Sequence, residues 1–387
     1  MTKDLRLVLT TGNYNYIKDG VALTLNQLVG WLERHGVEVM IVAPEAKQPA
    51  LEHVGRLEPV PSFAVPKRNE YRIGLPIGRE LRRKIRAFNP HLFHITLPDI
   101  TGHSALRLAR RMRVPAVSSY HTRFDVYLRY YRLQLLKPLM HYGERAFYGK
   151  CQTLFVPSLS MMEALKANGI GDDNMRLWTR GIDHARFNPR KRSLAWRRAH
   201  GVGDDEVLIT FAGRLVAEKN VDLLIRVFNA LKARQGPAHC TMLLGDGPEA
   251  ERMRQALPDT VFAGFLHDDE LATGYASSDI FFFPSASETF GNVTLEAMAS
   301  GLPTVAADAT GSRSLVREGE TGFLVDPRDE ALMTDRLEHL VGDSALRAEF
   351  GARAREIAVS EYDWDRIFAG LLADYGAAIA GSSSSAS

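Results

Sequence analysis

Residues 281–301 read FFFPSASETFGNVTLEAMASG. The short apolar run at the start of this stretch predicts a buried strand. The pattern at Val293–Ser300 predicts a helix, and Gly291 supplies a turn immediately before it. The stretch is therefore a strand, a polar loop and a helix, which is the building unit of a parallel α/β sheet.

Two carboxylates, Glu288 and Glu296, lie on either side of this turn. On one continuous helix they would be about 12 Å apart along the axis, whereas the two carboxylates of a retaining glycosidase must be about 5.5 Å apart. With the turn, Glu288 lies on the loop, and the N–H groups of Asn292 and Val293 begin the helix and suit a phosphate. The carboxylates could then hold hydroxyls at opposite ends of an extended ligand. Spacing alone also allows a loop acid and an ordinary surface helix.

The alternation of short apolar runs with amphipathic stretches continues along the chain and predicts βαβ units around parallel sheets. In the first half, strands are expected at residues 5–10, 38–43, 92–95, 116–120 and 153–156. In the second half, strands are expected at residues 207–212, 241–244, 261–263, 280–283, 304–307 and 322–325.

A chain of 387 residues favours about two domains at roughly 150 residues each. We therefore predict an α/β fold with two doubly wound, Rossmann-like domains that face a central cleft. The predicted domains are residues 1–186 and 187–363, and a helix at 364–380 is expected to pack back on the first domain. The serine-rich residues 381–387 are expected to form a disordered tail.

The net charge of +2 conceals two halves of opposite sign. Residues 1–190 hold 29 Lys and Arg against 16 Asp and Glu, a net charge of +13, which leaves −11 for the remainder. The 2 cysteines exclude a disulfide framework and a four-cysteine zinc site. No apolar run is long enough to span a membrane, and the charged N-terminus does not resemble a signal peptide, so a cytoplasmic protein is expected.

The basic charge of the first half gathers at Lys67–Arg86, and residues 127–137 interleave cations with large apolar groups as YLRYYRLQLLK. A helix of this composition suits an anionic membrane surface. The alternative is a solvated helix face whose tyrosines pack inward. Nucleic acid is disfavoured as a partner, because the second half is acidic and no binding motif is present.

Three further loops carry residues that could bind an anion or a substrate. Gly213-Arg214 ends a strand and Lys219 precedes a helix, so this loop carries two cations that could neutralise a diphosphate. Gly20 lets the backbone approach a ligand at the start of a helix. His121 follows a strand, at the edge of an α/β sheet where ligands bind. Taken alone, each also has a structural explanation, as a solvated loop, a turn or a core histidine.

Taken together and in this order, the segments resemble the retaining glycosyltransferases of family 4, which have the GT-B fold. The resemblance runs from Gly20 to about Asp326, and its most specific part is Glu288, then seven residues, then Glu296 followed by AMASGLPTV. The other segments that match in the same register are Gly213-Arg214, Glu218-Lys219, residues 245–248 and Gly319–Gly322.

The resemblance implies how a nucleotide sugar would bind. Arg214 and Lys219 would bind the donor diphosphate and stabilise the leaving group, and Gly20 would let the first-domain loop close on the phosphates. Backbone amides would line the sugar and phosphate site at Phe290, Gly291, Asn292 and Val293.

Three side chains would contact the sugars of the donor. Glu288 would bind hydroxyls of the transferred sugar, Glu296 would hold the ribose, and His121 would contact the sugar near the reacting carbon. The catalytic residues implied are His121, Arg214, Lys219 and Glu288. No metal or other cofactor is implied, because cationic side chains and a helix end take the place of a metal ion.

Within the family, His121-Thr122 followed by Tyr127 and Tyr130-Tyr131 looks like the branch that glycosylates membrane lipids such as diacylglycerol or sphingolipids. That branch implies a UDP-sugar ahead of a GDP-sugar, a lipid acceptor, and peripheral binding to the anionic inner face of the membrane. The candidate acceptor or membrane residues are Asp19, Tyr127, Arg129, Tyr130 and Arg132. The first loop, YNYIKDG at residues 14–20, departs from the Gly-Gly pair of many relatives.

In the implied mechanism, an acceptor hydroxyl attacks the anomeric carbon from the front side, and the donor phosphate helps to accept its proton. The configuration is retained, and no side chain acts as a covalent nucleophile. Three alternatives stay open. The same chemistry could use a soluble saccharide or polyol, the fold could serve a sugar-phosphate epimerase or phosphorylase, or a non-catalytic protein could bind nucleotide sugars.

Overall fold

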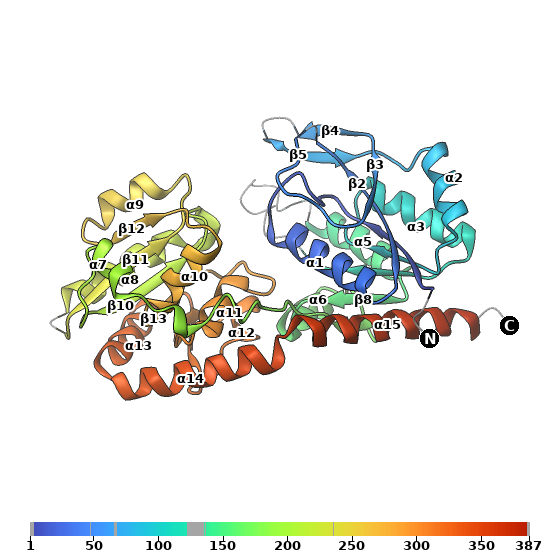
Figure 1. Cartoon of the computed structure of the whole chain (residues 1–387). Coiled ribbons are helices and arrows are strands. Elements are labelled where there is room, and N and C mark those ends of the chain that lie inside the picture. The colour runs from blue at the N-terminus through green and yellow to red at the C-terminus, as the bar shows by residue number, and fades with distance from the viewer. Residues whose placement is uncertain are drawn as a thin grey trace. The chain divides into compact units, whose positions relative to one another are not determined.

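The computed structural model describes residues 4–46, 48–65, 68–121, 135, 137–234 and 236–384. The chain forms two compact units (Figure 1): unit 1 is Met1–Thr179 with Asp365–Ser387, and unit 2 is Arg180–Trp364. The first boundary lies a few residues before the expected one, and the C-terminal segment belongs to unit 1. Each unit contains a parallel sheet with helices packed against it, so the predicted α/β fold of two Rossmann-like domains is confirmed.

Unit 1 contains a parallel sheet in the order β3-β2-β1-β6-β7-β8-β9. Its strands are β1 (Arg6–Thr10), β2 (Glu38–Pro44), β3 (Arg56–Val60), β6 (Leu92–Ile95), β7 (Ala116–Ser119), β8 (Thr153–Val156) and β9 (Met175–Leu177). A separate antiparallel hairpin is formed by β4 (Ser62–Val65) and β5 (Arg68–Gly74). The chain runs from β1 toward one edge of the sheet and from β6 toward the other, so a topological switch point lies between β1 and β6.

The helices of unit 1 are α1 (Gly20–Arg34), α2 (Arg79–Phe88), α3 (Ile100–Met112), α5 (Lys137–Tyr148), α6 (Leu159–Ala167) and α15 (Trp364–Ser384). The sheet is the core of the unit, and Leu7–Leu9 of β1 are fully buried. Helix α15 joins this core from the other end of the chain. Tyr375 is fully buried, and the Trp31 indole N–H donates to Asp365 at 2.7 Å.

The predicted disordered tail was wrong for residues 381–384, because α15 continues to Ser384. Serine lowers helix stability only modestly relative to alanine. The helix is already anchored by the buried Tyr375 and Ala378, so its hydrogen bonding extends beyond the last buried residue. Residues 385–387 lie outside the described part of the chain.

Unit 2 contains a parallel sheet in the order β12-β11-β10-β13-β14-β15. Its strands are β10 (Val207–Ala212), β11 (His239–Leu244), β12 (Val261–Gly264), β13 (Ile280–Phe283), β14 (Thr304–Ala307) and β15 (Gly322–Val325). Its α-helices are α7 (Leu194–Ala199), α8 (Val221–Ala233), α9 (Ala250–Ala256), α10 (Asp268–Ala276), α11 (Asn292–Ala299), α12 (Thr310–Arg313), α13 (Glu330–Gly342) and α14 (Ser344–Glu361). The switch point of this sheet lies between β10 and β13.

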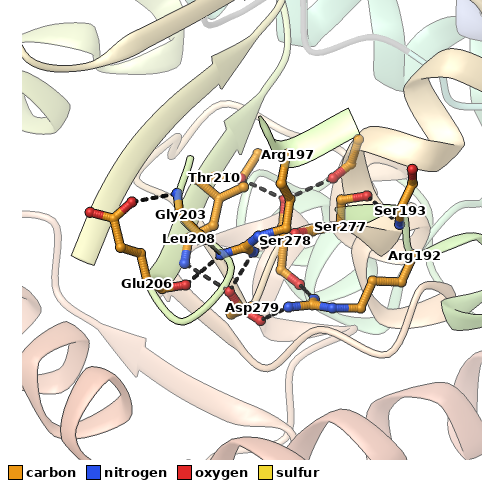
Figure 2. Close-up of polar contacts among 11 residues, drawn as sticks. Arg192, Ser193, Arg197, Gly203, Glu206, Leu208, Thr210, Ser277, Ser278 and Asp279 are labelled. Carbon is orange, nitrogen blue, oxygen red and sulfur yellow. Dashed lines mark hydrogen bonds and ion pairs between the residues drawn. The ribbon is translucent and has the colours of Figure 1, made fainter. Parts of the chain in front are cut away.

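A buried ion pair fixes the starts of these two central strands (Figure 2). The Arg197 side chain of α7 is fully buried and donates to Asp279 Oδ2 at 3.0 Å and to the Ser277 carbonyl at 2.8 Å. The same Asp279 oxygen accepts the backbone N–H of Leu208 at 2.8 Å. The guanidinium also donates to the Gly203 carbonyl at 2.8 Å. The pair therefore connects α7, the start of β10 and the residue before β13.

We expect the substitution R197M to destabilise unit 2 strongly, because it leaves Asp279 without its buried partner. Loss of one member of a buried pair costs about 3–5 kcal/mol. The matched control is R192M, which removes a partly exposed arginine from the same carboxylate and should cost less than about 1 kcal/mol. Urea unfolding measures both values, and equal losses would contradict the buried role of Arg197.

Candidate active site

Two loops of unit 2 follow β10 and β13, which are neighbours in the sheet. The first loop covers residues 213–220 and the second covers 284–291. Because the chain leaves the two strands toward opposite edges of the sheet, their loops meet at the switch point, where α/β proteins bind ligands. Together with Asn292, Val293 and Glu296 of the following helix α11, these loops hold every residue of unit 2 predicted to bind the donor.

Hydrogen bonds join the two loops. Ser287 Oγ donates to the Glu218 carbonyl at 3.0 Å, and Asn220 Nδ2 donates to the Pro284 carbonyl at 3.2 Å. The Lys219 ammonium forms an ion pair with Glu288. Two residues that the sequence assigns to the diphosphate and to the sugar are therefore in direct contact, and both are largely shielded from solvent.

The backbone at Glu288 is held tightly in place. Its carbonyl accepts a hydrogen bond from Thr310 Oγ1 at 2.7 Å. A Cβ atom at Gly311 would lie 2.4 Å from the Cβ of Glu288, so only glycine fits at the start of α12. Ser285 Oγ donates to the Glu288 carboxylate at 3.3 Å. The carboxylate is thus positioned by contacts to its backbone and its side chain.

The N-terminus of α11 faces the same loop without a side-chain cap. Gly291 precedes it with a φ of 102°, a left-handed conformation that glycine adopts without strain. The ring of Phe290 is buried against Tyr362, so the site can use only the backbone of Phe290. The amides of Asn292 and Val293 begin the helix, where the helix dipole favours an anion.

Glu296 lies in α11 and accepts a hydrogen bond from the Tyr275 hydroxyl at 3.0 Å. Burial raises the pKa of Glu296 to about 7, and the Tyr275 hydroxyl and the charge of Arg186 lower it by less. Such a carboxyl can accept hydrogen bonds from ligand hydroxyls when it is ionised. Tyr275 was missed in the sequence, because one tyrosine among the apolar residues of a helix carries no signal of a polar partner.

Two of the residues predicted in unit 1, Asp19 and Gly20, lie at the start of α1. Asp19 caps α1, since its Oδ1 accepts the N–H groups of Val21 at 3.0 Å and Ala22 at 2.8 Å. Gly20 is the first residue of that helix and is exposed. The structure thus gives Asp19 a structural function, and its role toward an acceptor stays a prediction.

Two tyrosines form hydrogen bonds in the first loop of unit 1, which departs from the Gly-Gly pair of many relatives. The Tyr14 hydroxyl donates to the Val54 carbonyl at 2.7 Å, and the Tyr16 hydroxyl donates to the Gly12 carbonyl at 2.8 Å. This loop is therefore held by one buried and one half-buried tyrosine.

His121 follows β7 and is almost fully buried. Its Nε2 lies 2.7 Å from Ser119 Oγ, and its ring packs edge-on against Trp178. The sequence singled out His121 but not Ser119, whose importance depends on this contact. Tyr127, Arg129, Tyr130 and Arg132 lie outside the described residues.

No group of three or more His, Cys, Asp and Glu side chains in the described part of the chain is placed to hold a metal ion. None of the helices in the same described part is long and apolar enough to cross a membrane.

Two doubly wound units, one of which carries cations, a paired carboxylate and an uncapped helix at its switch point, define a GT-B glycosyltransferase. The chain belongs to glycosyltransferase family 4: the family model described as Glycosyltransferase Family 4 matches residues 18–186, and that described as Glycosyl transferases group 1 matches residues 193–357. The predicted family is thus confirmed, and the protein is an enzyme that transfers a sugar from a nucleotide sugar.

Named relatives cover nearly the whole chain. A GDP-mannose-dependent alpha-mannosyltransferase of Corynebacterium glutamicum is 30% identical over 98% of this chain and 90% of its own length. The sulfoquinovosyl transferase SQD2 of Arabidopsis thaliana is 35% identical over 87% of this chain and 66% of its own. The solved structure of sucrose-phosphate synthase from Thermosynechococcus elongatus has a TM-score of 0.79 at 21% identity, covers 97% of this chain and 100% of its own, and shows the shared fold.

We expect E296Q to stabilise the unliganded protein above pH 7. Burial raises the pKa of Glu296 from 4.5 to about 7, so between these values the folded chain holds a proton that the unfolded chain has lost. Wild-type stability therefore falls as the pH rises through this interval, and a glutamine does not share that loss. The variant should match the wild type at pH 4 and exceed it by up to about 3 kcal/mol at pH 8.

Urea unfolding at several pH values measures this difference. The control is E251Q, at an exposed carboxyl of α9, which should show the same free energy of unfolding as the wild type throughout. A difference between E296Q and wild type that does not change with pH would contradict the raised pKa.

Proposed function

We propose that the protein transfers a sugar, with retention of its anomeric configuration, from a nucleoside-diphosphate sugar to a hydroxyl of a membrane lipid of the diacylglycerol or ceramide type. The proposal includes peripheral binding to the anionic inner face of the membrane and catalysis without a metal ion. The observation that carries the donor half of the proposal is the pairing of Lys219 with Glu288 beside the uncapped start of α11.

The charges of unit 2 support a diphosphate ligand. The Arg214 guanidinium is exposed and has no hydrogen-bond or ion-pair partner among the described residues. Lys219 is neutralised by Glu288 in the absence of ligand, and a phosphate could take the ammonium while a sugar hydroxyl takes the carboxylate. The uncapped amides of α11 supply further donors. Together these groups would neutralise the charge that develops on the leaving diphosphate.

The mechanism then needs little from the protein beyond position and charge. The acceptor hydroxyl attacks the anomeric carbon on the face that the diphosphate leaves, and a donor phosphate oxygen takes its proton. Glu288 holds the transferred sugar through its hydroxyls and forms no covalent bond. Arg214 and Lys219 supply the positive charge that a metal ion would otherwise supply.

An arginine-lined cavity of unit 1 supports an anionic membrane partner. The cavity has a volume of about 450 Å³, and its polar wall carries Arg82 of α2 with Arg107 and Arg111 of α3. No carboxylate in the described part of the chain pairs with these three arginines. Pro76, Ile100 and Leu108 form an apolar wall. Cations beside apolar groups match the phosphate headgroup and the first methylene groups of an anionic lipid.

Exposed apolar side chains support the same partner. Leu139 and Tyr142 of α5 are each 68% exposed, and Leu135 just before this helix is 95% exposed. They follow the basic and aromatic residues 127–134, which lie outside the described part of the chain. Exposed leucine and tyrosine beside basic residues are typical of a segment that lies at the surface of a bilayer.

The donor half of the proposal is tested by titration calorimetry with UDP and with GDP, each in the presence of EDTA. We expect one nucleotide to bind without metal. The resemblance to the lipid-glycosylating branch favours UDP, whereas the name of the Corynebacterium relative favours GDP. Arg214→Ala should lower turnover of the bound donor about a hundredfold, as removal of one donor to a developing oxyanion does. The control R226A removes a surface arginine paired with Glu330 and should keep wild-type turnover; equal turnover in R214A and R226A would contradict the assignment.

The acceptor half is tested by flotation with phosphatidylglycerol vesicles that contain diacylglycerol or ceramide. We expect the wild type to float and to be released by salt, because the attraction is electrostatic. R107E and R111E should each weaken binding about tenfold or more. R110E changes an exposed arginine of α3 that does not line the cavity, and it should bind nearly as well as wild type. A wild-type enzyme that stays unbound and glycosylates a soluble polyol would overturn the lipid acceptor but not the donor site.

A further inference from the structure

Four buried side chains of unit 1 form a continuous hydrogen-bonded chain that ends at His121. The Tyr375 hydroxyl of α15 lies 2.6 Å from His94 Nδ1 on β6, and His94 Nε2 lies 2.9 Å from Ser119 Oγ at the end of β7. The same oxygen lies 2.7 Å from His121 Nε2. Tyr375 and His94 are fully buried, and Ser119 and His121 are nearly so.

The ring of His94 carries one proton, on either Nδ1 or Nε2. Burial lowers the pKa of His94 to about 3, so its ring is neutral at physiological pH and one nitrogen donates while the other accepts. Edge-on contacts with Trp178 and Tyr375 and a tilted contact with Phe155 hold the ring in place. Each nitrogen therefore keeps a single hydroxyl partner.

The buried hydroxyl of Tyr375 determines the direction of its hydrogen bond with His94. Among the described residues its one hydrogen-bond partner is His94 Nδ1. If His94 Nδ1 carried the proton, the Tyr375 O–H would have no acceptor, and a buried donor without a partner is strongly disfavoured. The Tyr375 O–H therefore donates to Nδ1, and the proton of His94 is on Nε2.

The remaining links follow in turn. His94 Nε2–H donates to Ser119 Oγ. The Ser119 hydroxyl proton is then directed to its other partner, His121 Nε2. Since Nε2 of His121 accepts this hydrogen bond, the ring proton of His121 is on Nδ1.

We propose that Tyr375, His94 and Ser119 are positioning residues that hold His121 as its Nδ1–H tautomer, so that this histidine acts as a hydrogen-bond donor toward the transferred sugar. The inference rests on the proposed function for the role of His121, but the tautomer itself does not. In this form Nε2 is engaged by Ser119 and Nδ1 already holds a proton. His121 therefore cannot take the proton of the acceptor hydroxyl, which agrees with a donor phosphate as the proton acceptor.

The tautomer is read directly from the ¹⁵N shifts of the histidine rings in the full-length protein, with His121 assigned by its loss in H121N. We expect an unprotonated Nε2 and a protonated Nδ1 in the wild type. A protonated Nε2 would overturn the proposal, whatever the activity of the enzyme. S119A should move both nitrogens toward the average of the two tautomers, and S119T, which keeps a hydroxyl, should restore the wild-type shifts.

The matched control is S118A, which removes the neighbouring buried hydroxyl. This hydroxyl donates to the Ile95 carbonyl and does not contact the four hydrogen-bonded side chains. S119A should lower turnover about tenfold, the effect of one lost hydrogen bond, while nucleotide affinity stays within about twofold. S118A should keep both tautomer and turnover. The proposed positioning of His121 is wrong if S119A leaves its tautomer unchanged, or if S118A shifts the tautomer as much as S119A does. If the wild type lacks activity on lipids, the proposed acceptor is wrong, and the ¹⁵N shifts of the His121 ring still test its proposed tautomer.

Discussion

The parallel pairing of β10 with β13 is the contact on which the candidate donor site depends. Ile209 lies opposite Ile280 in this pair, although the two residues belong to different halves of unit 2. Because the chain leaves these strands toward opposite edges, their loops have no other strand end between them and must meet. The ion pair of Lys219 with Glu288 follows from that topology. At the other end of the same strands, Arg197 and Asp279 fix the pairing from within the core.

Much of unit 2 could be predicted from its sequence. The strands β10, β13, β14 and β15 have the expected bounds, because each is a short apolar run that is buried on both faces. In unit 1, β3 and the β4–β5 hairpin were missed. Arg56, Glu58 and Arg72 interrupt their apolar pattern, and polar residues are tolerated because β3 is an edge strand and the hairpin stands apart from the main sheet.

The residues of the candidate site could likewise be predicted only in part. Residues on strand-to-helix loops, such as Lys219 and Glu288, could be found because charge, glycine and position in the alternating pattern point to them. Tyr275, His94 and Ser119 could not, since each acquires its meaning from a partner elsewhere in the fold. Asp19 illustrates the opposite case: its position beside Gly20 drew attention to it as a ligand, whereas its carboxylate satisfies backbone amides of α1.

Helix α15 makes unit 1 discontinuous in the chain, because the whole of unit 2 is inserted between Thr179 and Asp365. During synthesis the N-terminal strands leave the ribosome first, yet Tyr375, whose hydroxyl contacts His94, emerges only after the whole of unit 2. The inserted unit has all its strands and its buried ion pair in one uninterrupted segment, so it can fold while its host is incomplete. Unit 1 can therefore be completed only after unit 2 has been synthesised, and a nascent chain released before α15 emerges would hold a complete unit 2 and an incomplete unit 1.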